Sequence, residues 1–239
     1  VQSQQQVETL CQRIIEMARH PYDIAGTQVF IGVSIGAALS PRDGTDRVEL
    51  TRKADVALYH CKRTGRSEFA IYAEAMDRSF NARRDMERDL RLAIDDSSQI
   101  MVYYQPLYSA VAGRVTGVEA LVRWHHPVQG WIAPDVFVPI AEETGLIGRL
   151  GLRVLRDACL SAAGWPIDTI AVNVSAIELR NPAYAMQVTN ELLASGLNPR
   201  RLELEVTESA LSDKGGECER NVTALRELGV RFALDDFGT

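Results

Sequence analysis

Cysteines are few in this chain and lie far apart. The 239 residues include four of them, and no two form a CxxC pair: Cys11, Cys61, Cys159 and Cys218. Zinc sites and disulfide frameworks need cysteines that are clustered or regularly spaced, so the sequence predicts neither. We expect four thiols in the core of a protein from a reducing compartment.

Long apolar runs and basic stripes are also missing. No run approaches the roughly 18 apolar residues that are needed to span a bilayer. The formal net charge is −6, whereas proteins that bind nucleic-acid polymers usually present a basic surface to the phosphates. The most basic stretch, residues 78–91, is interleaved with Asp and Glu and is typical of a solvated helix face. We therefore expect no nucleic-acid polymer as a partner.

The composition is that of an ordinary globular protein, with 46% hydrophobic and 24% charged residues. The pattern of residues 1–75 predicts a helix over 7–18, followed by a β-hairpin that turns at Gly26 and continues as an extended run over 28–39. A helix over 50–61 and a short strand over 68–72 come next. This order has no starting strand and indicates the second half of an α/β domain.

A charged helix over 74–96 connects this part to a region with a different pattern. Strands there alternate with helices, and the expected elements are strands 101–105, 115–124, 169–174, 201–206 and 231–235 and helices 146–163, 182–195 and 216–228. Crossover helices between strands predict a parallel sheet, either open or closed into a barrel. A complete barrel needs eight strands and about 250 residues, so only about five strands fit here.

Four of these strands carry a metal-capable side chain near their C-terminal end. The residues are Glu119, Asn173, Glu205 and Asp235, with Asp236 in the loop beyond. Side chains alternate between the two faces of a strand, and the neighbours of these polar residues are mostly apolar. We expect the apolar faces to pack against helices. The polar residues should line the barrel interior and meet at its C-terminal rim, where barrel enzymes place their chemistry.

Carboxylates that meet at one rim repel one another, and a hard divalent cation relieves this repulsion. Two such ions would balance the four carboxylates of Glu119, Glu205, Asp235 and Asp236. A paired-metal site can lower the pKa of a bridging water and stabilise an in-line phosphoryl displacement. The alternative is a set of solvated strand ends, because Asp235-Asp236 before Gly238 is also common turn chemistry.

Several motifs resemble the EAL phosphodiesterases, in the family's order and from about residue 84 to the end. They are Tyr103-Tyr104-Gln105-Pro106, Glu119-Ala120-Leu121-Val122-Arg123-Trp124, residues 134–139, residues 141–145, Asn173-Val174-Ser175, residues 205–209 and residues 235–239. The resemblance implies an incomplete TIM-like β/α barrel that hydrolyses cyclic di-GMP to pGpG with two Mg²⁺ or Mn²⁺ ions. It also implies a homodimer formed through the EAL domain.

The resemblance implies a role for each matching position. The metal ligands would be Glu119, Asn173, Glu205, Asp235 and Asp236, with Asp235 bridging two ions. Glu119, Asp235 and Asp236 would also be catalytic. Glu208 would be catalytic by holding the loop that begins at Asp236.

The substrate side of the site is also implied by the resemblance. Gln105 and Leu121 would contact the nucleotide, and Arg123 would contact a phosphate, which a guanidinium fork suits. Gln105 could equally be a structural strand residue, and Arg123 could form an ion pair at the barrel rim. We interpret His125 and His126 as exposed polar residues, since the oxygen ligands already suffice.

Residues 1–75 resemble the C-terminal half of a GGDEF diguanylate cyclase domain, a partial α/β sandwich. The motifs are Ser34-Ile35-Gly36, residues 54–59, Lys62 and Gly65-Arg66. Lys62 and Arg66 lie one helical turn apart and could hold the triphosphate of GTP. The alternative is an ordinary basic helix end, favoured by the helix dipole. We assign residues 76–97 to a helical connector and residues 98–239 to a partial EAL domain.

The chain starts at Val1 rather than Met. In the EAL family, a catalytic lysine and a further metal-binding glutamate lie on later strands, which these 239 residues lack. We expect a piece of a longer protein, with cytoplasmic domains that an upstream segment could anchor to the inner membrane. The 239 residues alone would form an open barrel of poor stability and no activity. The main hypothesis is a phosphodiesterase, and the alternative is a catalytically inactive sensor of cyclic di-GMP. The GGDEF half would serve as a GTP-binding regulator or as a cyclase in the longer protein.

Overall fold

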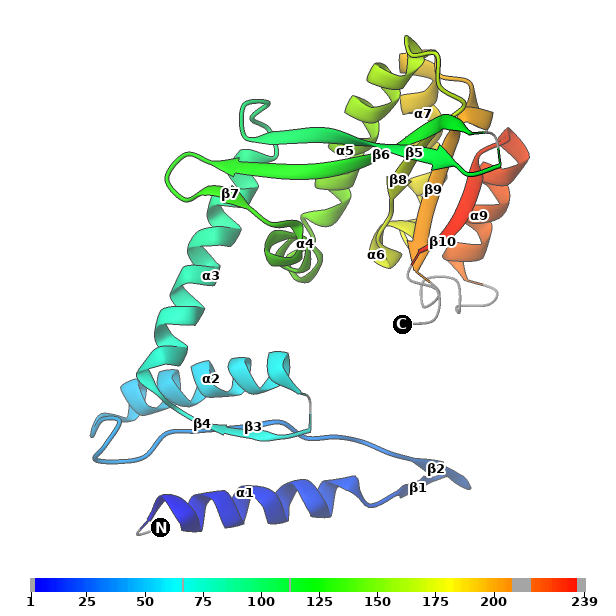
Figure 1. The fold of residues 1–239 in the computed structure, drawn as a ribbon. Helices are drawn as coiled ribbons and strands as arrows, with labels where there is room; N and C mark the ends of the chain where they lie inside the picture. Colours follow the sequence, from blue (N-terminus) through cyan, green and yellow to red (C-terminus); the bar gives the residue numbers. More distant parts are fainter. Residues whose placement is uncertain (1–2, 66, 112, 208–215, 236–239) are drawn as a thin grey trace. The chain divides into compact units, whose positions relative to one another are not determined.

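A computed structural model describes residues 3–65, 67–111, 113–207 and 216–235. The chain forms two compact units, Val1–Asp85 and Met86–Thr239. Helix α3, Glu74–Ala93, begins in the first unit and ends in the second (Figure 1). None of the helices in the described ranges combines the length and the apolar character that a membrane crossing requires.

The first unit follows the predicted order of elements with one exception. Helix α1 covers Gln4–Arg19, and strands β1, Tyr22–Ile24, and β2, Thr27–Val29, form the hairpin that turns at Gly26. The expected continuous run over 28–39 is wrong, because β2 ends at Val29. The chain then passes Ser67 so closely that a Cβ on Gly32 would lie 1.9 Å from its Oγ atom.

The second half of the first unit is a small sheet packed on a helix. Strand β3, Ile35–Ala37, pairs in parallel with β4, Phe69–Ile71, and helix α2, Arg47–Thr64, connects them. Gly36 lets the sheet approach this helix, since a Cβ there would lie 2.1 Å from the carbonyl oxygen of Ala54.

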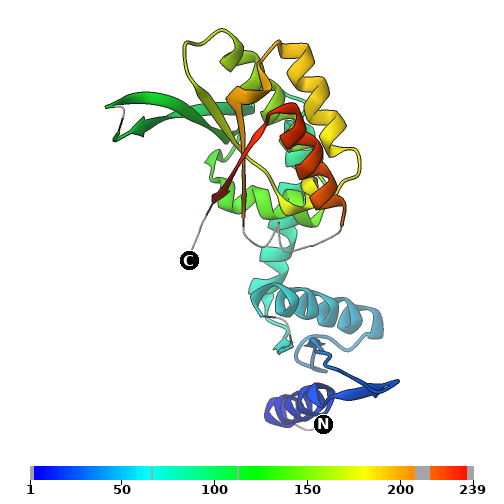
Figure 2. The ribbon, with the colours of Figure 1, turned by 90° about the vertical axis from the view of Figure 1, so that its right-hand side faces the viewer.

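A mixed sheet forms the centre of the second unit (Figures 1 and 2). Its strand order is β10-β9-β8-β6-β5, with β7 paired to β6. The strands are β5, Ile100–Ser109, β6, Arg114–His126, β7, Gly130–Ile132, β8, Thr169–Asn173, β9, Leu202–Thr207, and β10, Arg231–Asp235. Strands β6, β8, β9 and β10 are parallel, whereas β5 and β7 run antiparallel to β6. The expected parallel sheet is therefore confirmed for four strands.

Helices follow the strands as crossover connections. They are α4, Pro134–Glu143, α5, Ile147–Ala163, α6, Ala176–Leu179, α7, Tyr184–Ser195, and α9, Glu217–Leu228, with a 3₁₀ turn, η1, over Pro199–Arg201. The sequence did not predict α4, α6 or β7. Helix α4 contains prolines at both positions 134 and 139, and α6 is a single turn, so neither shows a helical period.

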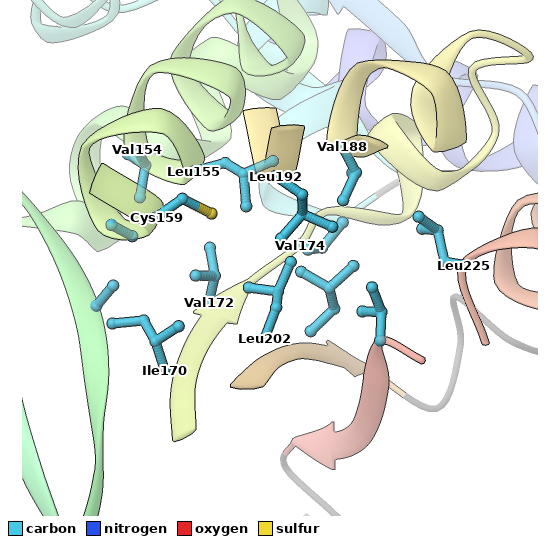
Figure 3. Packing of buried hydrophobic residues seen from close by; sticks show 14 of the residues in the cluster. Val154, Leu155, Cys159, Ile170, Val172, Val174, Val188, Leu192, Leu202 and Leu225 are labelled. Carbon is cyan, nitrogen blue, oxygen red and sulfur yellow. The ribbon is translucent and has the colours of Figure 1, made fainter. Parts of the chain in front are cut away.

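Apolar side chains on one face of the sheet pack against α5, α7 and α9 (Figure 3). The alternation predicted for β9 is confirmed: Leu202, Leu204 and Val206 are buried, while Glu203 and Glu205 are only partly covered. The four cysteines are buried and free, as predicted.

Candidate functional site

The sheet register brings three of the predicted site residues together. Asn173 on β8 pairs with Glu205 on β9, and Glu119 on β6 pairs with Ala171, two residues before Asn173. The side chain of Asn173 donates a hydrogen bond from Nδ2 to Oε1 of Glu119 over 2.8 Å. We call Glu119, Asn173 and Glu205 the polar rim. Asn173 is the last residue of β8 and Glu205 is two residues before the end of β9, whereas Glu119 lies within β6, one residue before its parallel pairing with β8 ends.

Gln105 and Leu121 lie beside the polar rim on the antiparallel pair of strands. Gln105 on β5 is directly opposite Glu119, and Tyr103 is directly opposite Leu121. Residues opposite one another in a ladder share a face of the sheet. Gln105 is exposed and Leu121 is half-buried, so both are accessible from the face that carries Glu119.

Other predicted site residues are at the edge of the described chain. Asp235 is the last residue of β10 and pairs with Thr207, two residues beyond the pair formed by Ala233 and Glu205. Asp236, Glu208 and Arg66 lie outside the described residues.

A cavity of about 310 Å³, which we call the rim cavity, lies beside the polar rim. Asn173, Glu205 and Arg123 provide polar groups at its wall, and Leu150 and Val154 of α5 provide apolar ones. Such a combination of an apolar wall with a few convergent polar groups is typical of small-molecule sites.

A second polar network lies on the wall of the rim cavity. Ser175 donates from Oγ to Oε1 of Glu142 over 2.5 Å, and its backbone N–H donates to Oε2 of Glu178 over 3.1 Å. Burial raises the pKa of Glu178 to about 7, and the charge of Glu142 adds to this effect. Sequence reasoning missed this network, although the Ser-x-x-Glu spacing of a capping box at Ser175 was a usable signal.

Arg123 is half-buried and lies between two hollows. It lines the rim cavity and also a second hollow of about 520 Å³, together with Tyr103, Trp131, Ile132, Ala133 and Pro134. Its Nη1 atom donates to the carbonyl oxygen of Val122 over 2.9 Å. This backbone contact holds one side of the guanidinium.

The interpretation of His126 as an exposed residue is wrong. His126 is only 6% exposed, whereas His125 is exposed as expected. The Nδ1 atom of His126 accepts the backbone N–H groups of Val128 and Gln129 over 3.1 and 3.0 Å, and Nε2 lies 3.2 Å from Oδ2 of Asp89. The imidazole ring of His126 thus holds the backbone of the loop after β6, so His126 is a structural residue.

Lys62 is exposed in the last turn of α2. Gly65 caps this helix by donating its backbone N–H to the carbonyl oxygen of Cys61. A basic side chain at a helix C-terminus interacts favourably with the helix dipole, which is the structural alternative to a phosphate contact.

The donor set of the polar rim fits a hard divalent cation. Two carboxylates and one amide supply oxygen ligands, and the hydrogen bond from Asn173 Nδ2 leaves its amide oxygen as the atom able to coordinate a cation. Within the described part of the chain no group of three or more His, Cys, Asp or Glu side chains is placed to hold a metal. The fit therefore rests on Glu119, Asn173 and Glu205.

Comparison with known proteins identifies two families. The family described as "EAL domain" matches residues 87–239, and the family described as "Diguanylate cyclase, GGDEF domain" matches residues 1–68.

Similar proteins cover nearly all of this chain. An uncharacterized signaling protein of Caulobacter vibrioides is 47% identical over 96% of the chain and 28% of its own length. The bifunctional diguanylate cyclase/cyclic di-GMP phosphodiesterase MucR of Pseudomonas aeruginosa is 38% identical over 97% of the chain and 34% of its own length. The chain thus spans roughly a third of these relatives.

A solved structure has a similar fold to part of this chain. The PaMucR phosphodiesterase in complex with c-di-GMP matches with a TM-score of 0.61 and 39% identity, over 65% of this chain and 64% of that one.

Proposed function

Because this chain belongs to the EAL domain family and carries the C-terminal part of a GGDEF domain at residues 1–68, we propose that the protein hydrolyses cyclic di-GMP to linear pGpG. The observation that supports this proposal most is the polar rim, in which Asn173 bonds to Glu119 over 2.8 Å and pairs with Glu205. A domain that only binds a nucleotide has no need for this set of oxygen ligands.

Glu119, Asn173 and Glu205 would hold a divalent cation, Mg²⁺ or Mn²⁺, and Asp235 and Asp236 would complete the site for a second ion. When bound, such ions lower the pKa of a water and neutralise charge on the reacting phosphate. The hydrogen bond from Asn173 fixes the Glu119 carboxylate, so the two ligands keep their relative position while the ion binds.

The remaining residues would bind and orient the substrate. Arg123 faces the rim cavity with a half-buried guanidinium, which suits a phosphate next to the polar rim. Gln105 and Leu121 share the face of Glu119 and would contact the nucleotide. Glu208 would hold the loop that begins at Asp236.

In the proposed reaction a water oxygen bonds to one phosphorus of the cyclic dinucleotide. One ester bond between that phosphorus and a ribose oxygen breaks, and the leaving oxygen takes up a proton. One water is thus added across one P–O bond, and the ring opens to a single linear product that keeps both phosphate groups, so no other co-reactant is needed.

The test is hydrolysis of cyclic di-GMP by the full-length protein in Mg²⁺, in EDTA and in Mg²⁺ with added GTP, with Glu119→Ala as the inactive control. We expect pGpG that forms only with the metal ion and is lost in the variant. Any effect of GTP would assign a regulatory role to the half of the chain that contains Lys62. Tight binding of cyclic di-GMP without turnover would overturn the enzyme proposal and leave a sensor of the nucleotide.

A further inference from the structure

The two residues that follow Asn173 are fixed by hydrogen bonds to other elements. The backbone N–H of Val174 donates to the carbonyl oxygen of Glu205 on β9 over 2.9 Å. The hydroxyl of Ser175 donates to Oε1 of Glu142, near the end of α4, over 2.5 Å. The chain that leaves β8 is therefore tied both to the neighbouring strand and to a helix.

The bond between Ser175 and Glu142 joins residues that are 33 positions apart. Bonds of about 2.5–2.7 Å from a hydroxyl to a carboxylate are charge-assisted, and they are about twice as strong as neutral ones. This bond is partly buried, and both residues line the rim cavity together with Asn173. Glu142 is thus placed to act on the polar rim without belonging to it.

The side chain of Asn173 depends on the backbone at this end of the strand. Asn173 is the last residue of β8 and is exposed, so packing contributes little to its orientation. Its Nδ2 atom donates to Glu119, which leaves the amide oxygen for a cation. Any displacement of Ser175, two residues further on, would move the backbone from which this amide extends.

We propose that Glu142 is a positioning residue, which holds Ser175 and thereby keeps the amide of Asn173 directed at the cation of the polar rim. This inference rests on the proposed function and adds a residue that does not contact the ion. The partners that orient metal ligands typically change metal affinity by 10- to 100-fold when they are substituted.

Two other roles of Glu142 lead to different expectations. A direct metal ligand would need its negative charge, whereas a positioning residue needs only an oxygen that accepts the hydroxyl of Ser175. A residue that merely packs α4 would affect the free energy of unfolding and leave metal affinity unchanged. Metal binding by matched variants separates the three roles.

The test measures Mn²⁺ binding to the full-length protein without nucleotide, from the electron paramagnetic resonance signal of free Mn²⁺. The variants are Glu142→Ala, Glu142→Gln and Ser175→Ala, and the Mn²⁺ site that is lost in Glu119→Ala is assigned to the polar rim. Glu143→Ala is the matched control, because Glu143 is the next residue of α4, is exposed and lies outside the lining of the rim cavity. Urea unfolding without a metal ion reports the stability of each variant.

We expect Glu142→Ala and Ser175→Ala to weaken Mn²⁺ binding at the polar rim about tenfold, the lower end of the range for ligand-orienting residues. Glu142→Gln should keep most of the affinity, since its amide oxygen still accepts the hydroxyl of Ser175. Glu143→Ala should bind Mn²⁺ as the wild type does. Ser175→Ala removes the same bond from its other partner, so the test does not depend on one variant that folds.

A double variant examines whether Glu142 acts through Asn173. Asn173→Ala alone should weaken Mn²⁺ binding, and the addition of Glu142→Ala should cause no further loss, because the side chain to be positioned is already gone. Two losses that add in full would overturn the positioning role. An equal loss of affinity in Glu142→Gln and Glu142→Ala would also overturn it and make Glu142 a direct ligand.

Hydrolysis of cyclic di-GMP in Mg²⁺, measured on the same proteins, separates this inference from the proposed function. If the wild type hydrolyses the nucleotide and Glu142→Ala keeps its Mn²⁺ affinity, the enzyme proposal stands and the positioning role is wrong. If Glu142→Ala loses affinity but the wild type does not hydrolyse the nucleotide, the positioning role stands and the enzyme proposal fails. A wild type without a Mn²⁺ site that depends on Glu119 would overturn both.

Discussion

The carboxyl group of Glu178 packs directly against the α carbon of Gly151. A Cβ added at Gly151 would lie 1.8 Å from Oε1 of Glu178 and 2.6 Å from its Cδ. Glu178 belongs to α6, which follows β8, the strand of Asn173. Gly151 belongs to α5, which lines the rim cavity. This contact therefore connects the segment after Asn173 to the helix on the other side of the cavity.

Gly151→Ala should destabilise the second unit. In an open helix, alanine is favoured over glycine by about 1 kcal/mol. Here the methyl group would displace the buried carboxyl of Glu178, and overpacking of this kind typically costs about 1–3 kcal/mol. Urea unfolding, followed by circular dichroism, measures the change in the free energy of unfolding.

Gly148→Ala is the matched control for this variant. Gly148 is in the same helix, and a Cβ there would meet nothing within 4 Å. We expect this substitution to stabilise the protein by up to about 1 kcal/mol. Equal effects at positions 148 and 151 would contradict the assigned packing of Glu178.

The ionisation of Glu178 should make stability depend on pH. Burial raises its pKa from 4.5 in the unfolded chain to about 7 in the fold. The folded state therefore binds more protons between these values, so its stability falls as the pH rises from about 4.5 to about 7. The loss is on the order of 3 kcal/mol.

Glu178→Gln should remove this part of the pH dependence, because an amide does not ionise. Its side-chain oxygen can still accept the backbone N–H of Ser175, which now bonds to Glu178 over 3.1 Å. Urea unfolding at pH 5, 6, 7 and 8 gives the slope for each protein. Glu227→Gln, at an exposed position of α9, should keep the wild-type slope. A variant at position 178 that also keeps it would show that Glu178 is ionised throughout the range.

Asn173→Ala should weaken the metal dependence of the proposed hydrolysis. The variant loses a proposed oxygen ligand and the 2.8 Å hydrogen bond between Asn173 Nδ2 and Glu119 Oε1. Loss of a ligand-orienting contact typically costs 10- to 100-fold in metal affinity. We expect the Mg²⁺ concentration for half-maximal hydrolysis to rise by about that factor.

An asparagine elsewhere provides the comparison for this measurement. Asn198 is exposed, and its side chain accepts the backbone N–H of Arg200 at the 3₁₀ turn. Asn198→Ala should leave the Mg²⁺ requirement unchanged. An unchanged requirement in Asn173→Ala would remove Asn173 from the proposed ligands.

Much of this fold follows from local pattern. Alternation of Leu202 and Leu204 with Glu203 and Glu205 predicts which face of β9 is buried, and the burial confirms it. The same rule predicts that Glu119 and Asn173 face one side of the sheet, and the parallel pairing of β6 with β8 brings their side chains together. These predictions succeed because the period of a strand is a property of the backbone.

The features that sequence reasoning missed depend on contacts distant in the chain. The buried carboxyl of Glu178 needs the space left by Gly151, 27 positions earlier, which no short window reveals. The antiparallel extension of β6 with Trp131 depends on pairing with β7, a strand of three residues. Helix α4 was missed because two prolines hide its period.

His126 offers a test of a residue whose role the sequence alone did not predict. His126→Ala would leave the N–H groups of Val128 and Gln129 and the carboxylate of Asp89 without their ring partner. Groups that lose a buried partner cost about 1–3 kcal/mol, so we expect a decrease of that size in the free energy of unfolding. The neighbouring His125 is exposed, and His125→Ala should change stability by no more than about 0.5 kcal/mol. Urea unfolding without nucleotide compares the two, and equal effects would contradict the structural role of His126.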